Sequence, residues 1–289
     1  MKKFTSQEIK EFLSKPHFDE KAILNKNLSW PKISIVTPSY NQAEFLERTI
    51  LSVLNQNYPN LEYIIIDGGS TDGSVEIIKK YQKYLAYWVS ESDRGQSHAL
   101  NKGFCLCTGE YIGWQNSDDI YLPGTFHSFA RRTQRHPAYD IYYAHQYVID
   151  KDENIIRPCV TTRPSKFYEK YRGMIVRTQS SFFSKSMLSV IGLMDEKLQF
   201  AMDRDFFLRA VLSNRRLFFV NEFWGAFRWH ESCKSGGNNK AAWIVERRYI
   251  SKKYRITSEK HLKFKTQLAR LWKGFLIIQS GNWWYFFER

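Results

Sequence analysis

The chain has 289 residues, enough for one large or two modest domains, and its 43% hydrophobic content can build a sizeable core. Its formal net charge of +14 indicates an anionic partner: nucleotide phosphates, an anionic membrane surface or nucleic acid. No apolar run reaches the roughly 18 residues of a membrane span and no apolar signal region opens the chain, so we expect a cytoplasmic protein. The four cysteines lack metal-binding or disulfide spacing, and reduced thiols are expected.

An alternation of strands and helices begins after a polar, lysine-rich N-terminal arm (residues 1–31) that is weakly helical around residues 6–13. Apolar runs predict buried strands at residues 33–38 and 61–66 and short strands at residues 87–90 and 111–114. Apolar residues at helical spacing predict helices at residues 43–56, about 77–85 and 96–107, and Pro123-Gly124 opens another helix. Continuous apolar strands that alternate with helices predict a mostly parallel central sheet with helices on both faces.

Polar residues gather where each predicted strand ends, at residues 37–41, 67–72, 91–95 and 116–119. Parallel α/β sheets bind their ligands at the carboxyl ends of the strands, so these clusters should form the wall of one pocket. No G-x-G-x-x-G follows the first strand, which disfavours a dinucleotide-binding fold of the usual type.

Two adjacent carboxylates, Asp118 and Asp119, close the last of these clusters. Like charges at a strand end repel each other and raise each other's pKa. A divalent cation removes that cost, because Mg²⁺ or Mn²⁺ is usually held by one or two carboxylates, water and substrate phosphates. The alternative is a surface turn with solvated acids.

The ordered motifs resemble those of family 2 glycosyltransferases. They are the segments Thr37-Pro-Ser-Tyr-Asn41, Asp67-Gly-Gly-Ser-Thr-Asp-Gly73, Asp93-Arg-Gly-Gln-Ser-His-Ala-Leu-Asn-Lys-Gly103 and Asn116-Ser-Asp-Asp119. The resemblance implies the Rossmann-like GT-A α/β fold over residues 32–238, with a nucleotide-binding part at 32–125 and an acceptor part at 126–238. It also implies an inverting transfer from a nucleotide-sugar donor, with UDP as the expected nucleotide.

The same resemblance implies which residues contact the nucleotide sugar. They are Thr37, Pro38, Tyr40, Asp67, Asp93, Gly95, Asn101, Asn116 and Ser117. Asp67 resembles the acid that reads the base edge, although an Asp before Gly-Gly also commonly caps a turn. Asn101 has an alternative role as a cap at the end of its helix.

The cation is expected to be Mn²⁺ or Mg²⁺. Asp118 matches the metal-ligating acid of the family's D-x-D motif, with Asp119 as a helper, although this chain has Asn116 at the first position. His230 lies in a segment that resembles the R-x-H-x-x-S of some relatives and is a further candidate metal ligand. Arg228 and Lys234, in the same segment, are candidates to neutralise the diphosphate.

The expected general base is Asp203, in a stretch that resembles the family's E-D helix and has Met202 where Glu is common. The alternative role of Asp203 is a helix N-cap, and Asp205 is the second choice for the base. Arg209 is expected to orient loops through ion pairs. An acceptor hydroxyl would lose its proton to this carboxylate as it attacks the anomeric carbon.

Residues 239–289 form a basic, aromatic extension that is expected to be helical, and residues 240–289 carry a net +9 of the total charge. The segment 262–289 is either an anchor on an anionic membrane surface or a helix packed on the catalytic domain. An anchor would suit a lipid-linked acceptor in surface polysaccharide synthesis; a glycan is the other acceptor considered. The rival functions are a non-catalytic nucleotide-sugar-binding protein and, less favoured, a nucleic-acid-binding protein. The sequence does not indicate the oligomeric state.

Overall fold

The computed structural model describes residues 1–24, 29–234, 239–256 and 262–286. Several expected features extend beyond these ranges and are partly outside the described residues. The parts outside are residues 25–28 of the N-terminal arm, residues 235–238 at the end of the predicted acceptor part, and residues 257–261 and 287–289 of the C-terminal extension.

A single sheet runs through the described part of the chain, with strand order β3-β2-β1-β4-β8-β6-β9-β5 and with β7 paired to β6. Its strands are β1 (Ile33–Ser39), β2 (Leu61–Asp67), β3 (Tyr87–Ser90), β4 (Tyr111–Trp114), β5 (Ile120–Tyr121), β6 (Ile141–Ile149), β7 (Ile155–Cys159), β8 (Ser181–Ser184) and β9 (Leu217–Arg228). Strands β1 to β4 are parallel, β8 runs antiparallel to β4 and β6, and β6 and β9 pair in parallel. The mostly parallel sheet expected from the sequence is therefore confirmed, with a change of direction beyond β4.

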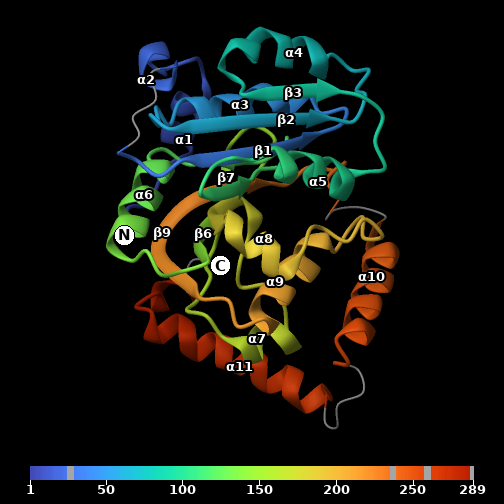
Figure 1. Cartoon of the computed structure of the whole chain (residues 1–289). Helices are drawn as coiled ribbons and strands as arrows, with labels where there is room; N and C mark the ends of the chain where they lie inside the picture. The colour runs from blue at the N-terminus through green and yellow to red at the C-terminus, as the bar shows by residue number, and fades with distance from the viewer. Residues whose placement is uncertain (25–28, 235–238, 257–261, 287–289) are drawn as a thin grey trace.

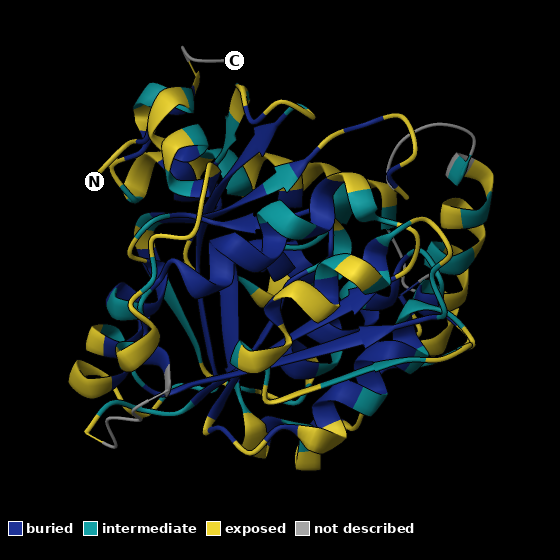
Figure 2. Ribbon diagram, turned by 90° about the horizontal axis from the view of Figure 1, so that it is seen from above, coloured by how far each residue is buried: buried dark blue, intermediate teal, exposed yellow. Residues whose placement is uncertain are grey.

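Helices cover both faces of the sheet, as Figure 1 shows. They are α1 (Ser6–Leu13), α2 (Glu20–Leu24), α3 (Ala43–Leu54), α4 (Ser74–Tyr81), α5 (Gln96–Leu106), α6 (Thr125–Arg135), α7 (Lys166–Tyr171), α8 (Lys185–Ile191), α9 (Met202–Leu212), α10 (Lys240–Lys253) and α11 (Leu262–Gln279), with short 3₁₀ turns η1 (Gln82–Tyr84), η2 (Thr178–Ser180) and η4 (Trp283–Phe286). The buried strands in the centre and the exposed outer helix faces are visible in Figure 2.

Two hydrophobic clusters fill the space between the sheet and its helices. Alternate strand residues face opposite ways, so Ile35 and Ile65 pack with α3, α4 and α6, whereas Val36 and Ile64 pack with α5, α8 and α9. The four predicted strands and the helices between them are confirmed. Helix α3 ends at Leu54, two residues before the predicted end, and is followed by a turn in which Asn57 adopts a left-handed φ of 50°.

The N-terminal and C-terminal segments that the structure describes both pack on the domain. Ile9 and Leu13 of α1 are buried in a cluster with residues that follow the Asp118–Asp119 turn and with β6. In the C-terminal extension, α11 lies against α7, and its residue Ile277 is buried with Val160. Asn282, only 1% exposed, donates to Asn221 Oδ1 at 3.0 Å. One face of the extension therefore packs on the domain, which was one of the two alternatives considered.

No helix within the described ranges combines the length and the apolar character that crossing a membrane requires.

Candidate active site

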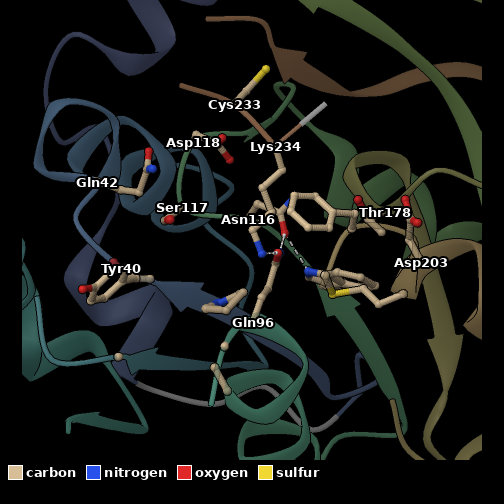
Figure 3. A pocket seen from close by; sticks show the side chains of 18 of the residues that line it. Tyr40, Gln42, Gln96, Asn116, Ser117, Asp118, Thr178, Asp203, Cys233 and Lys234 are labelled. Carbon is tan, nitrogen blue, oxygen red and sulfur yellow. Dashed lines mark hydrogen bonds between the residues drawn. The ribbon is translucent and has the colours of Figure 1, made fainter. Parts of the chain in front are cut away.

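A cavity of about 430 Å³ opens at the carboxyl ends of β1, β2, β3 and β4. Its walls come from segments far apart in the sequence and include Pro38, Tyr40, Gly68, Asp93, Gly95, Gln96, Asn116, Ser117, Asp118, Thr178, Gln179, Phe200, Met202, Asp203 and Lys234. Figure 3 shows the labelled side chains around this space. The volume falls within the range of small-molecule sites, so the convergence expected at this edge of the sheet forms a pocket large enough for a ligand.

Asn116 connects the wall of the cavity to the protein scaffold. Its Oδ1 accepts hydrogen bonds from Trp114 Nε1 at 2.8 Å and from Gln96 Nε2 at 2.7 Å. Its amide donates to Asp119 Oδ2 at 3.0 Å. An amide that holds three partners is already oriented, so Asn116 shapes the turn as well as facing the cavity.

The adjacent carboxylates Asp118 and Asp119 point to different places. Asp118 lines the cavity, and its Oδ2 lies 3.1 Å from His230 Nε2. Asp119 has no exposed surface; its Oδ1 accepts from the Arg228 N–H at 2.9 Å and its Oδ2 from Gln179 Nε2 at 2.7 Å. Burial, with the Asp118 charge beside it, raises the pKa of Asp119. Asp118 is thus placed to meet a ligand, whereas Asp119 holds the turn together.

His230 is brought to Asp118 from the loop that follows β9. Its Nδ1 lies 2.8 Å from Ser232 Oγ, and its ring packs against Phe45 with 4.6 Å between the ring centroids. Within the described ranges, no group of three or more His, Cys, Asp or Glu side chains is arranged to hold a metal ion. Asp118 and His230 are a suitable pair of ligands for Mn²⁺, with substrate phosphates and water left to complete the shell. Metal ligation by Asp118, Asp119 and His230 stays a prediction.

Two residues expected to contact the nucleotide lie beneath the cavity rather than in its wall. The carboxylate of Asp67, with no exposed surface, accepts hydrogen bonds from Ser70 Oγ at 2.5 Å, Ser90 Oγ at 2.7 Å and the Ser70 N–H at 2.8 Å. Thr37 is buried and bonds to the Tyr63 hydroxyl at 3.1 Å. Asp67 thus caps the turn, which was the alternative role given to it. Recognition of the nucleotide base by Asp67 stays a prediction, and these contacts do not favour it.

The remaining donor-side candidates divide between the cavity and the scaffold. Tyr40 stands at the rim with 61% of its surface exposed, and Asp93 faces the cavity while accepting the Gly95 N–H at 2.7 Å. Asn101 lies outside the cavity wall; its amide donates to Met194 O at 3.1 Å and its Oδ1 accepts the Met194 N–H at 2.8 Å. Asn101 therefore ties α5 to the loop after α8.

Asp203 faces the cavity from the first turn of α9, across from the strand ends. Its Oδ1 accepts the Arg204 N–H at 2.6 Å, and burial raises the pKa of its carboxyl group above the usual value. A carboxylate with a raised pKa in a cavity suits a general base, because it binds a proton more strongly near neutral pH.

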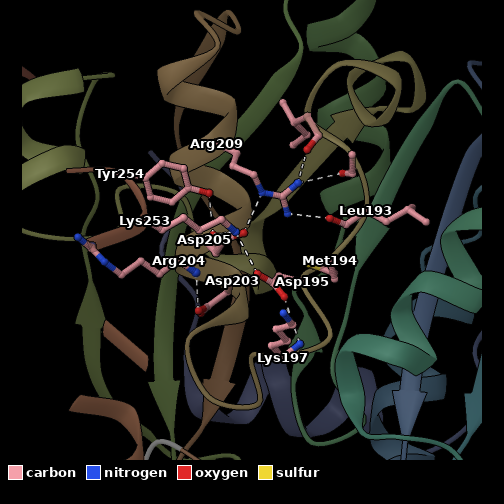
Figure 4. Close-up of polar contacts among 12 residues, drawn as sticks. Leu193, Met194, Asp195, Lys197, Asp203, Arg204, Asp205, Arg209, Lys253 and Tyr254 are labelled. Carbon is pink, nitrogen blue, oxygen red and sulfur yellow. Dashed lines mark hydrogen bonds and ion pairs between the residues drawn. The ribbon is translucent and has the colours of Figure 1, made fainter. Parts of the chain in front are cut away.

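Asp205 occupies the opposite side of α9, outside the cavity (Figure 4). Its Oδ2 accepts from Arg209 Nε at 2.8 Å, and its Oδ1 accepts from Lys253 Nζ at 3.0 Å and the Tyr254 hydroxyl at 2.7 Å. Arg209 also donates to the carbonyl oxygens of Ile191 and Leu193. These contacts are structural, so they leave Asp203 as the better-placed base, and Arg209 orients the loop as expected.

The two basic residues proposed for the diphosphate differ in the same way. Arg228 has no exposed surface, and its guanidinium donates to Asp118 O at 2.8 Å and Glu153 Oε1 at 3.0 Å, so it supports the turn from behind. Lys234 lines the cavity and donates to Gln96 Oε1 at 3.0 Å and Gln199 O at 3.2 Å. Loss of hydration lowers the pKa of the Lys234 ammonium.

Several cavity residues had no predicted role, among them Gln96, Thr178, Gln179 and Phe200. Gln96 directly follows Gly95 in a motif expected at the cavity, and this position was a usable signal that Gln96 would line it. Thr178 and Gln179 come from a loop without a recognisable motif, and only the fold brings them to the strand ends.

A family model described as glycosyl transferase family 2 matches residues 34–190 of the chain. An uncharacterized glycosyltransferase of Mycobacterium tuberculosis is 30% identical over 188 residues, which cover 64% of this chain and 70% of the relative. TuaG of Bacillus subtilis, named as a candidate teichuronic acid biosynthesis glycosyltransferase, is 38% identical over 94 residues, or 31% of this chain and 36% of TuaG. The matched part of a third relative, from Nostoc, spans about half (47%) of its length.

Two solved structures share the architecture. TarS 1–349 of S. aureus in complex with UDP-GlcNAc gives a TM-score of 0.61 at 19% identity, covering 82% of this chain and 70% of TarS 1–349. The mannosyltransferase PcManGT from Pyrobaculum calidifontis, in complex with GDP-Man and Mn²⁺, gives a TM-score of 0.55 at 16% identity, covering 92% and 79%. At these identities the similarity concerns the fold, and it confirms the expected GT-A α/β architecture.

Proposed function

The chain belongs to glycosyl transferase family 2, and from that premise we propose that it transfers a hexose from a nucleotide sugar to a hydroxyl group, with inversion at the anomeric carbon. The observation that carries the proposal is the placement of Asp118 and Asp203 in one cavity of about 430 Å³. Figure 3 shows the two carboxylates reaching this space from different sides. A donor held near Asp118 would leave room for an acceptor near Asp203.

Each residue has a distinct part in the proposed reaction. Asp203 takes the proton of the acceptor hydroxyl, and its raised pKa makes it a stronger base near neutral pH. Asp118, with His230 beside it, would hold a divalent cation through oxygen and nitrogen ligands. A bound cation supplies charge that stabilises the departing diphosphate. Lys234 stands at the same wall, where its ammonium would meet the phosphates as negative charge develops.

UDP is the first nucleotide to test. TarS was solved with UDP-GlcNAc, and TuaG is named for teichuronic acid biosynthesis, which supports a UDP-sugar and a glycan or lipid-linked acceptor. PcManGT was solved with GDP-Man and Mn²⁺, so GDP is the next nucleotide and Mn²⁺ the first cation.

The test of the donor site is thermal unfolding with UDP, GDP, dTDP and CMP, each with and without Mn²⁺. We expect one diphosphate to raise the melting temperature, more with Mn²⁺ than without, and the Asp118→Ala variant to lose this response. Turnover is then measured as nucleotide release from the matching sugar donor. Absence of any shift with all four nucleotides would contradict the proposed donor site.

The proposal includes a peripheral position on an anionic membrane surface. Helix α11 exposes apolar side chains along one side, at Phe264, Leu268, Leu271, Trp272, Phe275 and Ile278. Their spacing of three to four residues places them on one face, opposite the buried Ala269 and Ile277. The net +9 of residues 240–289 complements anionic headgroups, and apolar contact beside basic residues is how interfacial helices bind.

Vesicle flotation tests this surface without removing the packed extension. The variant Leu271→Glu/Phe275→Glu changes two exposed positions and should retain the fold. We expect the wild-type protein to float with vesicles containing phosphatidylglycerol but not with pure phosphatidylcholine, and the variant to remain in the lower fraction. Equal flotation of variant and wild type would contradict the membrane surface.

One observation favours a second candidate function, a non-catalytic nucleotide-sugar-binding protein. Met202 stands in the cavity wall where the family commonly has Glu, and its sulfur accepts from Ser97 Oγ at 3.2 Å. Donor binding without nucleotide release, across a broad screen of acceptors, would favour this function over transfer.

A further inference from the structure

Helix α9, which carries Asp203, begins without a cap of its own. Its N-cap residue is Ala201, which has no side-chain oxygen to accept the free N–H groups of the first turn. The segment before it exposes three successive backbone N–H groups, those of Gln199, Phe200 and Ala201. Such consecutive donors form a concave site that favours an anion.

Glu246, 45 to 47 residues further along the chain in α10, fills that site. Its Oε1 accepts the Gln199 N–H at 2.7 Å, and its Oε2 accepts the N–H groups of Phe200 and Ala201, both at 2.8 Å. Hydrogen bonds from N–H groups to a carboxylate are among the stronger ones in proteins. Glu246 therefore holds, from α10, the backbone segment that leads into the first turn of α9.

The segment held by Glu246 contributes directly to the cavity. Phe200 lies in its wall, and Asp203 is two residues beyond Ala201. The Gln199 side chain donates to Arg94 O at 3.2 Å, and the Gln199 carbonyl accepts from Lys234. A shift of residues 199–201 would therefore move the base and the contacts around Lys234 together.

A second set of contacts fixes α10 against α9. Lys253 bonds to Asp205 and to Asp195, in each case at 3.0 Å, and Tyr254 donates to Asp205 at 2.7 Å. Figure 4 shows these side chains gathered around Asp205, with Asp203 apart from them. Helix α10 is thus tied to α9 through two separate groups, one before Asp203 and one after it.

We infer that Glu246 is a positioning residue for the transfer: its carboxylate fixes residues 199–201 and thereby places Asp203 for proton abstraction. This inference rests on the proposed function. It assigns a role in the reaction to the C-terminal extension, which lies outside the residues matched by the family model. Glu246 acts through the backbone and does not itself contact the cavity.

The test compares Glu246→Gln with the wild type, using UDP-GlcNAc and the release of UDP in the presence of Mn²⁺. The amide of Gln has one acceptor and one donor group, so at least one of the three N–H groups loses its partner. We expect kcat to fall tenfold or more while the KM for UDP-GlcNAc stays within twofold. Amide hydrogen exchange should become faster at residues 199–203. Glu76→Gln, the same change at an exposed position on α4, should match the wild type in both measurements.

A double-mutant cycle separates positioning from a general loss of stability. If Glu246 acts through Asp203, adding Glu246→Gln to Asp203→Asn should lower the remaining rate by less than twofold. Glu246→Asp, which keeps the carboxylate, should recover part of kcat and serves if the Gln variant does not fold. Two results would overturn this inference but not the proposed function. One is a Glu246→Gln variant as active as an active wild type. The other is a Glu246→Gln change that still lowers the rate tenfold in the Asp203→Asn background. A wild type that releases no nucleotide from any donor tested would overturn the proposed function and this inference with it.

Discussion

The contrast between Asp118 and Asp119 predicts that removing either carboxylate will have very different consequences. Asp119→Ala leaves the buried Arg228 N–H and Gln179 amide without an acceptor, and it also removes one acceptor of the partly buried Asn116 amide. A buried donor without a partner costs about 1–3 kcal/mol, so two of them cost roughly 2–6 kcal/mol. Burial and the Asp118 charge disfavour the ionised form of Asp119, so removing its carboxylate recovers part of this cost. We expect a net loss of roughly 2–4 kcal/mol in the free energy of unfolding.

Asp118→Ala is the matched variant. The Asp118 side chain is 18% exposed and has one described contact, with His230, so we expect its removal to cost less than about 1 kcal/mol. The Asp118 carbonyl still accepts from Arg228 after the change. The loss should instead fall on the response to nucleotide and Mn²⁺, because Asp118 faces the cavity.

Urea unfolding of the two variants and the wild type gives the stability difference, and thermal shift with UDP and Mn²⁺ gives the ligand response. Equal destabilisation by the two changes would refute the assignment of Asp119 to the scaffold. A folded Asp119→Ala variant that loses the Mn²⁺ response while Asp118→Ala keeps it would place the metal ligand at Asp119 instead.

Three further predictions concern other parts of the site and the scaffold. Asp203→Asn should lower kcat by about 100-fold or more, with nucleotide binding retained, because an amide cannot accept the acceptor proton; unchanged nucleotide release in a coupled assay would remove Asp203 from the base role. Burial raises the pKa of Glu169 to about 7, so the folded state binds its proton more tightly and stability falls as the pH rises from about 4.5 to 7. Glu169→Gln should therefore gain roughly 2–3 kcal/mol relative to the wild type between pH 5 and pH 8 in urea unfolding, and a constant difference would contradict this. Gly225→Ala should prevent stable folding, because the added Cβ would overlap the Gln179 carbonyl. Gly274→Ala in α11, where the nearest neighbour of the added Cβ is Phe286 at 4.0 Å, should be neutral or stabilising by up to about 1 kcal/mol. Soluble yield and urea unfolding of both variants check these two expectations.

The sequence predicted the edge of the sheet at which the cavity lies because the rule behind that prediction is geometrical. Parallel strands place their carboxyl ends at one edge, so the residues after β1, β2, β3 and β4 had to meet there. Pro38, Asp93 and Asp118 reach the cavity for this reason. Within that edge, however, a motif does not reveal the direction in which a side chain points.

Asp67 and Asp119 illustrate this limit. Each lies in a cluster that meets at the cavity, and each turns inward to accept hydrogen bonds from the scaffold, some of them from residues outside its own motif. Asn116 is a local partner of Asp119, but its other two partners are 60 and 109 positions away, so no local pattern identifies them. The contact of Glu246 with residues 199–201 was hidden for the same reason, because its partners lie 45 to 47 positions away.

The support of the Asp118–Asp119 turn also determines when in synthesis the site can form. Strand β4, before the turn, pairs with β1, which has already left the ribosome, whereas Ile120, after the turn, pairs with Ala226 of β9. Arg228, which bonds to both acids, is 110 positions beyond Asp118. At 5–20 residues per second, the ribosome needs roughly 5–20 seconds to add that length of chain. During this interval the growing polypeptide already contains every motif up to Asp119 but not the strand that completes the turn. The Asp118–Asp119 turn can therefore be completed only late in translation, after β9 has been added.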